Sequence, residues 1–207
     1  MGKRWDAKND RKKQNRSRRR YLIVCEDSKS AVDYLESFRI SEEFAEVVTE
    51  GGAGNTVSVV EKAISLKEEA EYNHKPYAHI WAVMDRDEHP VDRYRRAFDL
   101  GKLHNDLTVI WANESFELWY LLHFCYRDTE IGRAEINREL GAGERLNRKY
   151  EKFDKEVFAL LEGRTQIAIK HATRLGRFNP SPMTNPSTNI HLLVGELIRL
   201  QAAANES

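Results

Sequence analysis

The stretch His79-Ile80-Trp81-Ala82-Val83-Met84 is a continuous apolar run of strand length, and Asp85-Arg86-Asp87 follows it directly. An uninterrupted apolar strand is typical of a parallel sheet that is buried on both faces. Working outward, similar short runs occur at 21–25, 44–49 and 107–112, and longer amphipathic stretches separate them. This alternation predicts β-α-β units, and hence an α/β fold with a central, mostly parallel sheet of about four strands flanked by helices.

Beyond residue 126 the strand-like runs end and helical patterns take over. Helices are predicted at 133–140, at 151–162, at 164–175 and from Asn185-Pro186 onward, with Asn185 as the N-cap and Pro186 at the first helical position. We therefore expect three parts: a basic arm over 1–20, an α/β core over 21–126, and an α-helical extension over 127–207 that packs on the core.

The formal net charge of zero conceals an uneven distribution. Residues 1–20 contain ten Lys or Arg and two Asp, a net charge of +8, so the rest of the chain has a net charge of −8. A segment with so little apolar surface cannot form a core and is expected to be flexible. Two functions fit it. It is either a solubilising tail or a nucleic-acid-binding arm whose phosphate contacts include Arg16, Arg18, Arg19 and Arg20.

Several classes of protein are excluded by what the sequence lacks. No apolar run is long enough for a membrane span, and the N-terminus has no apolar signal core. Cys25 and Cys125 lie in apolar runs and are expected to be buried thiols, which indicates a reducing, cytoplasmic location. Neither a P-loop nor a Gly-x-Ser-x-Gly elbow is present, so P-loop ATP hydrolysis and serine hydrolase chemistry are not expected.

Acidic residues follow three of the predicted strands directly: Glu26 after the first, Asp85 and Asp87 after the third, and Glu114 and Glu117 after the fourth. Because ligands of an open α/β sheet bind outside the carboxyl ends of its strands, we expect these side chains to share one crevice. Several carboxylates in one crevice repel one another unless a cation lies between them. Hard oxygen ligands of this kind suit Mg²⁺ or Mn²⁺.

Each of these residues also has an ordinary structural explanation. An Asp after a strand often caps the next helix, and Glu114 and Glu117 can complement the positive end of the helix that opens there. Glu117 has apolar neighbours, so burial is an equally good expectation for it. His89 and His123 can serve as an acid, a base or a ligand, but a lone histidine is more often structural.

Five stretches resemble the RloB family, which comprises Toprim-like proteins of abortive-infection and restriction-linked loci. They are YLIVCE (21–26), WAVMDRDEH (81–89), NESFELWYLLHF (113–124), YEK (150–152) and NPSTNIH (185–191). The second and third stretches are the specific ones, and the others corroborate them. A Glu after one strand and an Asp-x-Asp after a later strand is also the Toprim arrangement of topoisomerases, primases and OLD-type nucleases.

The resemblance implies a Toprim-like, Rossmannoid core and metal-dependent phosphodiester chemistry. Glu26 would be the general base or a metal-positioning acid, and Asp85 and Asp87 would be ligands of Mg²⁺ or Mn²⁺. It also implies a role in antiphage defence, often beside a partner ATPase encoded nearby. One departure stands out: the family usually has Gly after the first Glu and then a Thr-Glu pair, whereas this chain has Asp27-Ser28-Lys29-Ser30-Ala31.

Our first hypothesis is a Mg²⁺-dependent nuclease that cuts DNA or RNA, tRNA included, during abortive infection. Its catalytic residues would be Glu26, Asp85, Asp87 and Glu117, and its substrate contacts Lys29, Arg86, His89 and Lys152. The second hypothesis is a non-catalytic nucleic-acid-binding or regulatory subunit of a defence ATPase complex. A phosphoryl or nucleotidyl transferase that uses the same metal cluster is a third, and a homo-oligomer is compatible with all three.

Overall fold

The computed structural model describes residues 18–26, 29–42, 45–86, 90–142, 145–146, 149–151 and 157–206. Within these ranges one five-stranded sheet has the order β2-β1-β3-β4-β5. Its strands are β1 (Arg19–Cys25), β2 (Ala45–Glu50), β3 (His79–Asp85), β4 (Leu107–Asn113) and β5 (Ser187–Thr188). The first four are parallel, which confirms the predicted α/β sheet, and β5 adds an antiparallel strand that the sequence did not predict.

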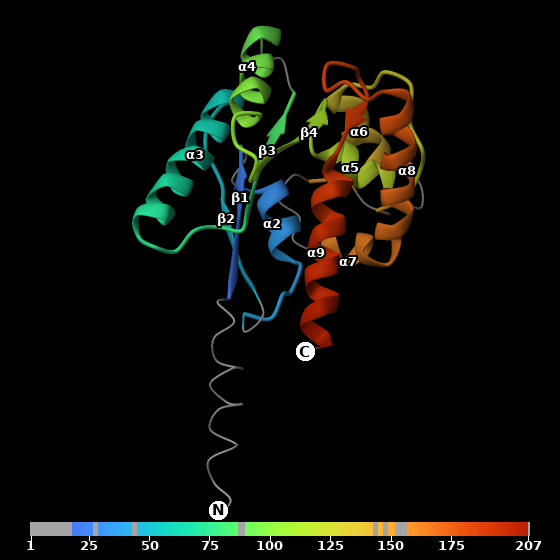
Figure 1. The fold of residues 1–207 in the computed structure, drawn as a ribbon. Helices are drawn as coiled ribbons and strands as arrows, with labels where there is room; N and C mark the ends of the chain where they lie inside the picture. Colours follow the sequence, from blue (N-terminus) through green and yellow to red (C-terminus); the bar gives the residue numbers. More distant parts are fainter. Residues whose placement is uncertain are drawn as a thin grey trace, which may run out of the picture.

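Helices cover both faces of the sheet (Figure 1). One face is covered by α3 (Thr56–Tyr72) and α4 (Val91–Gly101). The other side holds α2 (Ser30–Glu36), α5 (Glu117–Leu122), α6 (Arg133–Leu140), α7 (Val157–Leu161), a short 3₁₀ turn (Glu162–Arg164), α8 (Thr165–Phe178) and α9 (Ile190–Asn205). Strand residues alternate between the two cores, as the pleat requires: Leu22 and Val24 belong to the first, and Tyr21, Ile23 and Cys25 to the second.

Helix α5 is the centre of the second core. All six of its residues are buried, Glu117 and the apolar run from Leu118 to Leu122. The same core continues from the strands through α6, α8 and α9, so the C-terminal helices share their interior with the sheet. No helix in the described part of the chain is long and apolar enough to cross a membrane.

The last helix begins at Ile190, so the predicted start at Asn185-Pro186 is wrong. Asn185 does not cap a helix. Its side chain donates to the carbonyl oxygen of Ile131 at 3.1 Å and accepts from the backbone N–H of Ile131 at 3.2 Å. After Pro186, Ser187 and Thr188 pair with the end of β4. The polar Asn-Pro-Ser-Thr sequence therefore satisfies backbone groups of other segments before the helix can start.

The side chain of Asn189 forms hydrogen bonds with the part of the β4 edge that β5 does not reach. Its buried side chain accepts from the backbone N–H of Trp111 at 2.8 Å and donates to the carbonyl oxygen of Val109 at 3.0 Å. A single amide thus replaces two of the hydrogen bonds that a longer strand would make.

We expect Asn189→Ala to lower the free energy of unfolding by about 2–4 kcal/mol, because it leaves one buried N–H and one buried C=O without partners. Urea unfolding monitored by circular dichroism measures this. Asn205→Ala, at the exposed end of α9, is the control and should change stability by less than about 0.5 kcal/mol. Equal effects of the two substitutions would contradict the role assigned to Asn189.

His123 is a buried core residue and not a site residue. It directly follows α5, is fully buried, and has Nδ1 2.9 Å from the carbonyl oxygen of Trp119. Burial lowers the pKa of His123 to about 4. The fold therefore holds the neutral imidazole, with Nδ1–H donating to Trp119, and this answers the question that the sequence left open for His123.

The depressed pKa of His123 predicts a loss of stability in acid. In the unfolded chain the imidazole takes up a proton near pH 6.5, whereas in the fold it resists protonation down to about pH 4. The contribution of His123 is complete above pH 6.5 and falls by about 3 kcal/mol between pH 6.5 and 4. Unfolding measured across this range should show that loss in the wild type and not in His123→Gln. Parallel pH profiles for the two proteins would refute it.

Candidate functional site

The central strand pair brings Glu26 and Asp85 together at the carboxyl edge of the sheet. Cys25, the last residue of β1, lies opposite Val83 in the parallel register, so Glu26 is level with Met84, one residue before Asp85 at the end of β3. The backbone N–H of Glu26 donates to the carbonyl oxygen of Val83 at 3.0 Å, and that of Asp85 donates to Glu26 Oε2 at 3.2 Å. The chain continues from β1 to β2 on one side and returns to β3 on the other. Such a reversal of strand order is where open α/β sheets bind ligands.

The start of helix α6 brings a cation to this edge and lies against a third acid. Arg133, its first residue, places a guanidinium nitrogen 3.4 Å from Asp85 Oδ2, and the Asp85 side chain is only 17% exposed. Glu114, which follows β4, lies with Oε2 3.7 Å from the position that a Cβ on Gly132 would occupy. Its carboxylate therefore packs against the N-cap residue of α6, where the helix dipole favours a negative charge.

The glycine-rich loop over 51–54 lies beside the end of β1. Gly52 and Gly54 have φ angles of 70° and 91°, a region that glycine adopts without steric strain. The backbone N–H of Ala53 donates to the carbonyl oxygen of Cys25 at 3.2 Å, directly before Glu26. This hydrogen bond holds the loop against the end of β1, next to Glu26.

Two predicted substrate contacts are described by the structure. The Arg86 guanidinium lies 5.4 Å from the ring centroid of Tyr94 in α4, so Arg86 follows β3 toward the face covered by that helix. Lys29 is exposed, and its carbonyl oxygen accepts from the backbone N–H of Asp33 at 2.7 Å. Four further predicted residues lie outside the described ranges, and their roles stay predictions: Arg16, Asp87, His89 and Lys152.

Glu117 lies in the core and not at the open edge. It is 3% exposed, and Oε1 accepts from the hydroxyl of Tyr150 at 3.0 Å. Next to it, Tyr120 donates to the carbonyl oxygen of Ser30 at 2.8 Å. Burial, reinforced by Tyr150 and Glu117, raises the pKa of Tyr120 well above its ordinary value. This placement favours a structural role for Glu117, which ties α5 to the segment around Tyr150.

The described arginines of the basic arm lie at the amino end of β1, away from the carboxyl edge of the sheet. Strand β1 begins at Arg19, two residues before the predicted start, and Arg18 lies 3.6 Å from Glu42. Arg20 pairs with Glu46 at 3.1 Å, and this hydrogen bond raises the pKa of Arg20 and lowers that of Glu46. In an extended strand the distance from Arg20 to Glu26 is about 20 Å. These arginines therefore do not face the acidic edge.

The carboxylates of Glu26 and Asp85 fit a hard divalent cation. Mg²⁺ binds through one or two carboxylates and keeps several waters, and oxygen is the ligand it prefers. In the described part of the chain, no group of three or more His, Cys, Asp and Glu side chains is arranged to hold a metal ion. The described residues thus fit a site with two protein carboxylates and offer no all-protein cage.

A comparison with known protein families matches the part of the chain that contains the candidate site. A family model described as RloB-like protein matches residues 21–197, from the third residue of strand β1 into α9. The comparisons found no match among curated proteins or among solved structures. Because the matched region covers most of the chain and includes the whole carboxyl edge, the chain belongs to the RloB-like protein family.

Proposed function

We propose that this protein is a Mg²⁺-dependent nuclease of the Toprim class that cuts phosphodiester bonds of DNA or RNA in antiphage defence. The observation that carries the proposal is the meeting of Glu26 and Asp85 at the reversal of strand order, where the Asp85 backbone N–H holds Glu26 Oε2 at 3.2 Å. Membership of the RloB-like family is consistent with it. A partner ATPase encoded nearby would regulate the activity.

In this proposal Glu26, Asp85 and Asp87 hold the metal ion. When bound, Mg²⁺ supplies positive charge that stabilises the charge developing on the phosphate. Glu26, with one oxygen fixed by the Asp85 N–H, takes the proton of the attacking water. Arg133, next to Asp85, donates to a phosphate oxygen of the substrate, since a guanidinium fork matches that group.

We expect Asp85→Asn to lower the cleavage rate at least about 100-fold, because the neutral amide binds a divalent cation far more weakly than a carboxylate and forms no ion pair with Arg133. Purified protein is incubated with tRNA, plasmid and single-stranded DNA in Mg²⁺, Mn²⁺ or EDTA, and products are separated on gels. Asp92→Asn, an exposed acid on α4, is the control and should cut like the wild type. Cleavage by Asp85→Asn at the wild-type rate would exclude the proposed site.

The second candidate is a non-catalytic subunit that binds nucleic acid or regulates a defence ATPase. The contact between Arg133 and Asp85 favours it, because an arginine can neutralise a carboxylate that no longer holds a metal. Metal dependence separates the two functions. The subunit would bind equally well in EDTA and in Mg²⁺ and would form no product, with or without the ATPase.

A further inference from the structure

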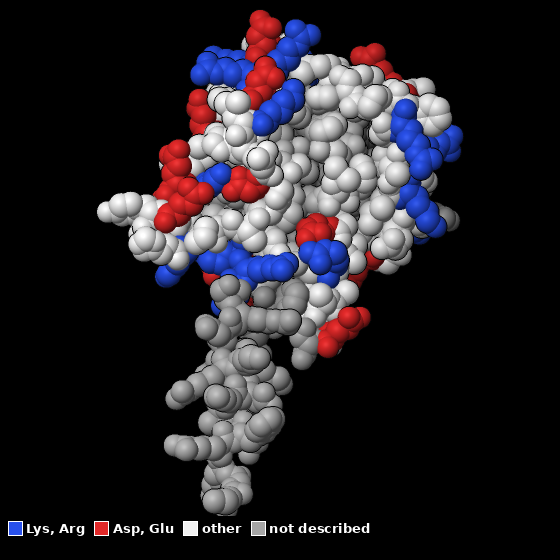
Figure 2. Space-filling view, viewed as in Figure 1, with Lys and Arg blue, Asp and Glu red and all other residues white. Residues whose placement is uncertain are grey.

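Helix α8 carries a row of basic side chains that the proposed function does not use. Lys170, Arg174 and Arg177 are exposed and are spaced by four and three residues, so they share one face of the helix. Figure 2 shows Lys and Arg side chains gathered over α8, at the right of the view. We call these three residues the α8 row.

The α8 row has no acidic residue near it in the sequence. Between Glu162 and Glu196 the chain contains four Lys and Arg and no Asp or Glu. This contrasts with the rest of the chain, because everything after residue 20 has a net charge of −8. The row is a positive surface on a domain that is otherwise acidic.

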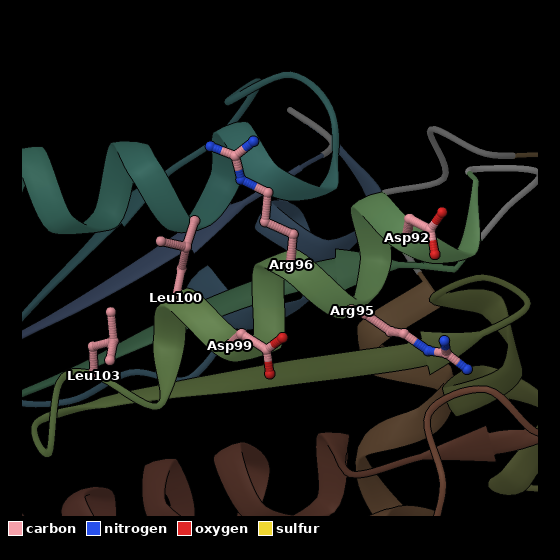
Figure 3. Close-up of a pocket in the computed structure, with 6 residues that line it drawn as sticks. All are labelled: Asp92, Arg95, Arg96, Asp99, Leu100 and Leu103. Atoms are coloured by element: carbon pink, nitrogen blue, oxygen red, sulfur yellow. The ribbon is translucent and has the colours of Figure 1, made fainter.

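Helix α4 shows the ordinary pattern of charge on an exposed helix of this protein. Arg95 and Arg96 are also exposed, but Asp92 and Asp99 lie on the same helix (Figure 3), and Arg96 lies 4.0 Å from Glu61. The mixed signs on α4 suit a solvated surface with no strong field. On α8 the charges have one sign, which favours a polyanionic ligand.

Aromatic rings support the guanidinium groups on and beside α8. Arg174 lies 4.0 Å from the ring centroid of Tyr126, and Arg164 lies 5.3 Å from that of Phe124. Stacking on a ring orients a guanidinium without neutralising its charge, so its N–H groups stay able to donate to a phosphate. Arginines held in this way lose less conformational entropy on binding than freely moving ones.

The α8 row leads toward the carboxyl edge of the sheet. Asn113, the last residue of β4, donates to the carbonyl oxygens of Pro182 and Thr184 at 3.1 and 3.0 Å. The loop that follows α8 therefore lies against this end of β4, and Arg177 is in the last turn of the helix before it. In contrast to Arg20 at the amino end of β1, the row is on the side of Glu26 and Asp85.

We propose that the α8 row binds the phosphate backbone of a nucleic acid and guides it to the carboxyl edge. The inference rests on the proposed function and deepens it, since it names the surface that holds the substrate. Seven residues of helix span about 10 Å, the length of about three phosphates of one strand. Contacts to phosphates carry no base information, so the binding is independent of sequence.

The test compares two triple variants of the full chain. One replaces Lys170, Arg174 and Arg177 with Gln. The matched control replaces Arg93, Arg95 and Arg96 with Gln; these side chains are also exposed, so both variants lose the same amount of positive charge. Binding of fluorescently labelled tRNA and labelled single-stranded DNA is measured by anisotropy over a range of KCl concentrations, in EDTA so that nothing is cut.

With the probe that the wild type binds more tightly, we expect the α8 variant to lose at least about tenfold in affinity near 0.1 M salt. The slope of log K against log salt should fall by about two to three, because up to three counterion-releasing contacts are removed. The α4 control should keep the wild-type slope. An unchanged slope in the α8 variant, an equal loss in both variants, or no binding by the wild type would overturn the proposal.

Cleavage assays in Mg²⁺ separate this proposal from the proposed function. If only the α8 variant loses binding and the wild type forms no product, the proposed binding surface is supported and the proposed nuclease activity is contradicted. If the wild type cuts and the α8 variant binds normally, the proposed nuclease activity is supported and the proposed binding surface is contradicted. A variant that binds nucleic acid normally but no longer associates with the neighbouring ATPase would assign α8 to an acidic protein partner and overturn the proposal.

Discussion

The parallel pairing of β1 with β3 is the constraint on which the candidate site depends. The interiors of both strands are buried, from Tyr21 to Cys25 in β1 and from Ile80 to Met84 in β3, so the backbone groups there need partners within the sheet. In the register that the two strands adopt, Cys25 lies opposite Val83. In this register Glu26 is level with Met84, one residue before Asp85, and the hydrogen bond from the Asp85 N–H to the Glu26 side chain extends the ladder by one step. The position of Glu26 beside Asp85 thus follows from the way in which two apolar strands pair.

Much of this arrangement could be predicted because it depends on local patterns. Apolar runs of strand length marked the four parallel strands to within one or two residues at most ends, and the apolar run over 118–122 forms a helix that is buried on all sides. The acids that follow β1, β3 and β4 had to share an edge, since parallel strands all point the same way. The sequence left the position of Glu117 open, because its apolar neighbours suited burial while its place after β4 suited the edge; in the structure it is buried and accepts from Tyr150.

The parts that escaped prediction are contacts between distant segments. Arg133 and Asp85 are 48 residues apart, and Asn189 and Trp111 are 78 apart, so no sequence period links them. They depend on how the C-terminal helices return to the sheet, which the shared core determines as a whole. The Asn-Pro pattern failed for a related reason: Asn185 can satisfy a helix N-terminus or any other pair of backbone groups, and here Ile131 is the nearer partner.

The short fifth strand has a consequence for the behaviour of the molecule in a crowded solution. An exposed strand edge is a template on which another chain can add a strand, and long apolar edges lead to aggregation. Beside β4, the two residues of β5 and the side chain of Asn189 use the backbone groups of Ala112, Asn113, Trp111 and Val109 that would otherwise be open. Helix α9 then begins at once and cannot be extended as a strand. This side of the sheet is therefore sealed against intermolecular strand addition, and β2 is left as the edge at which such pairing could occur.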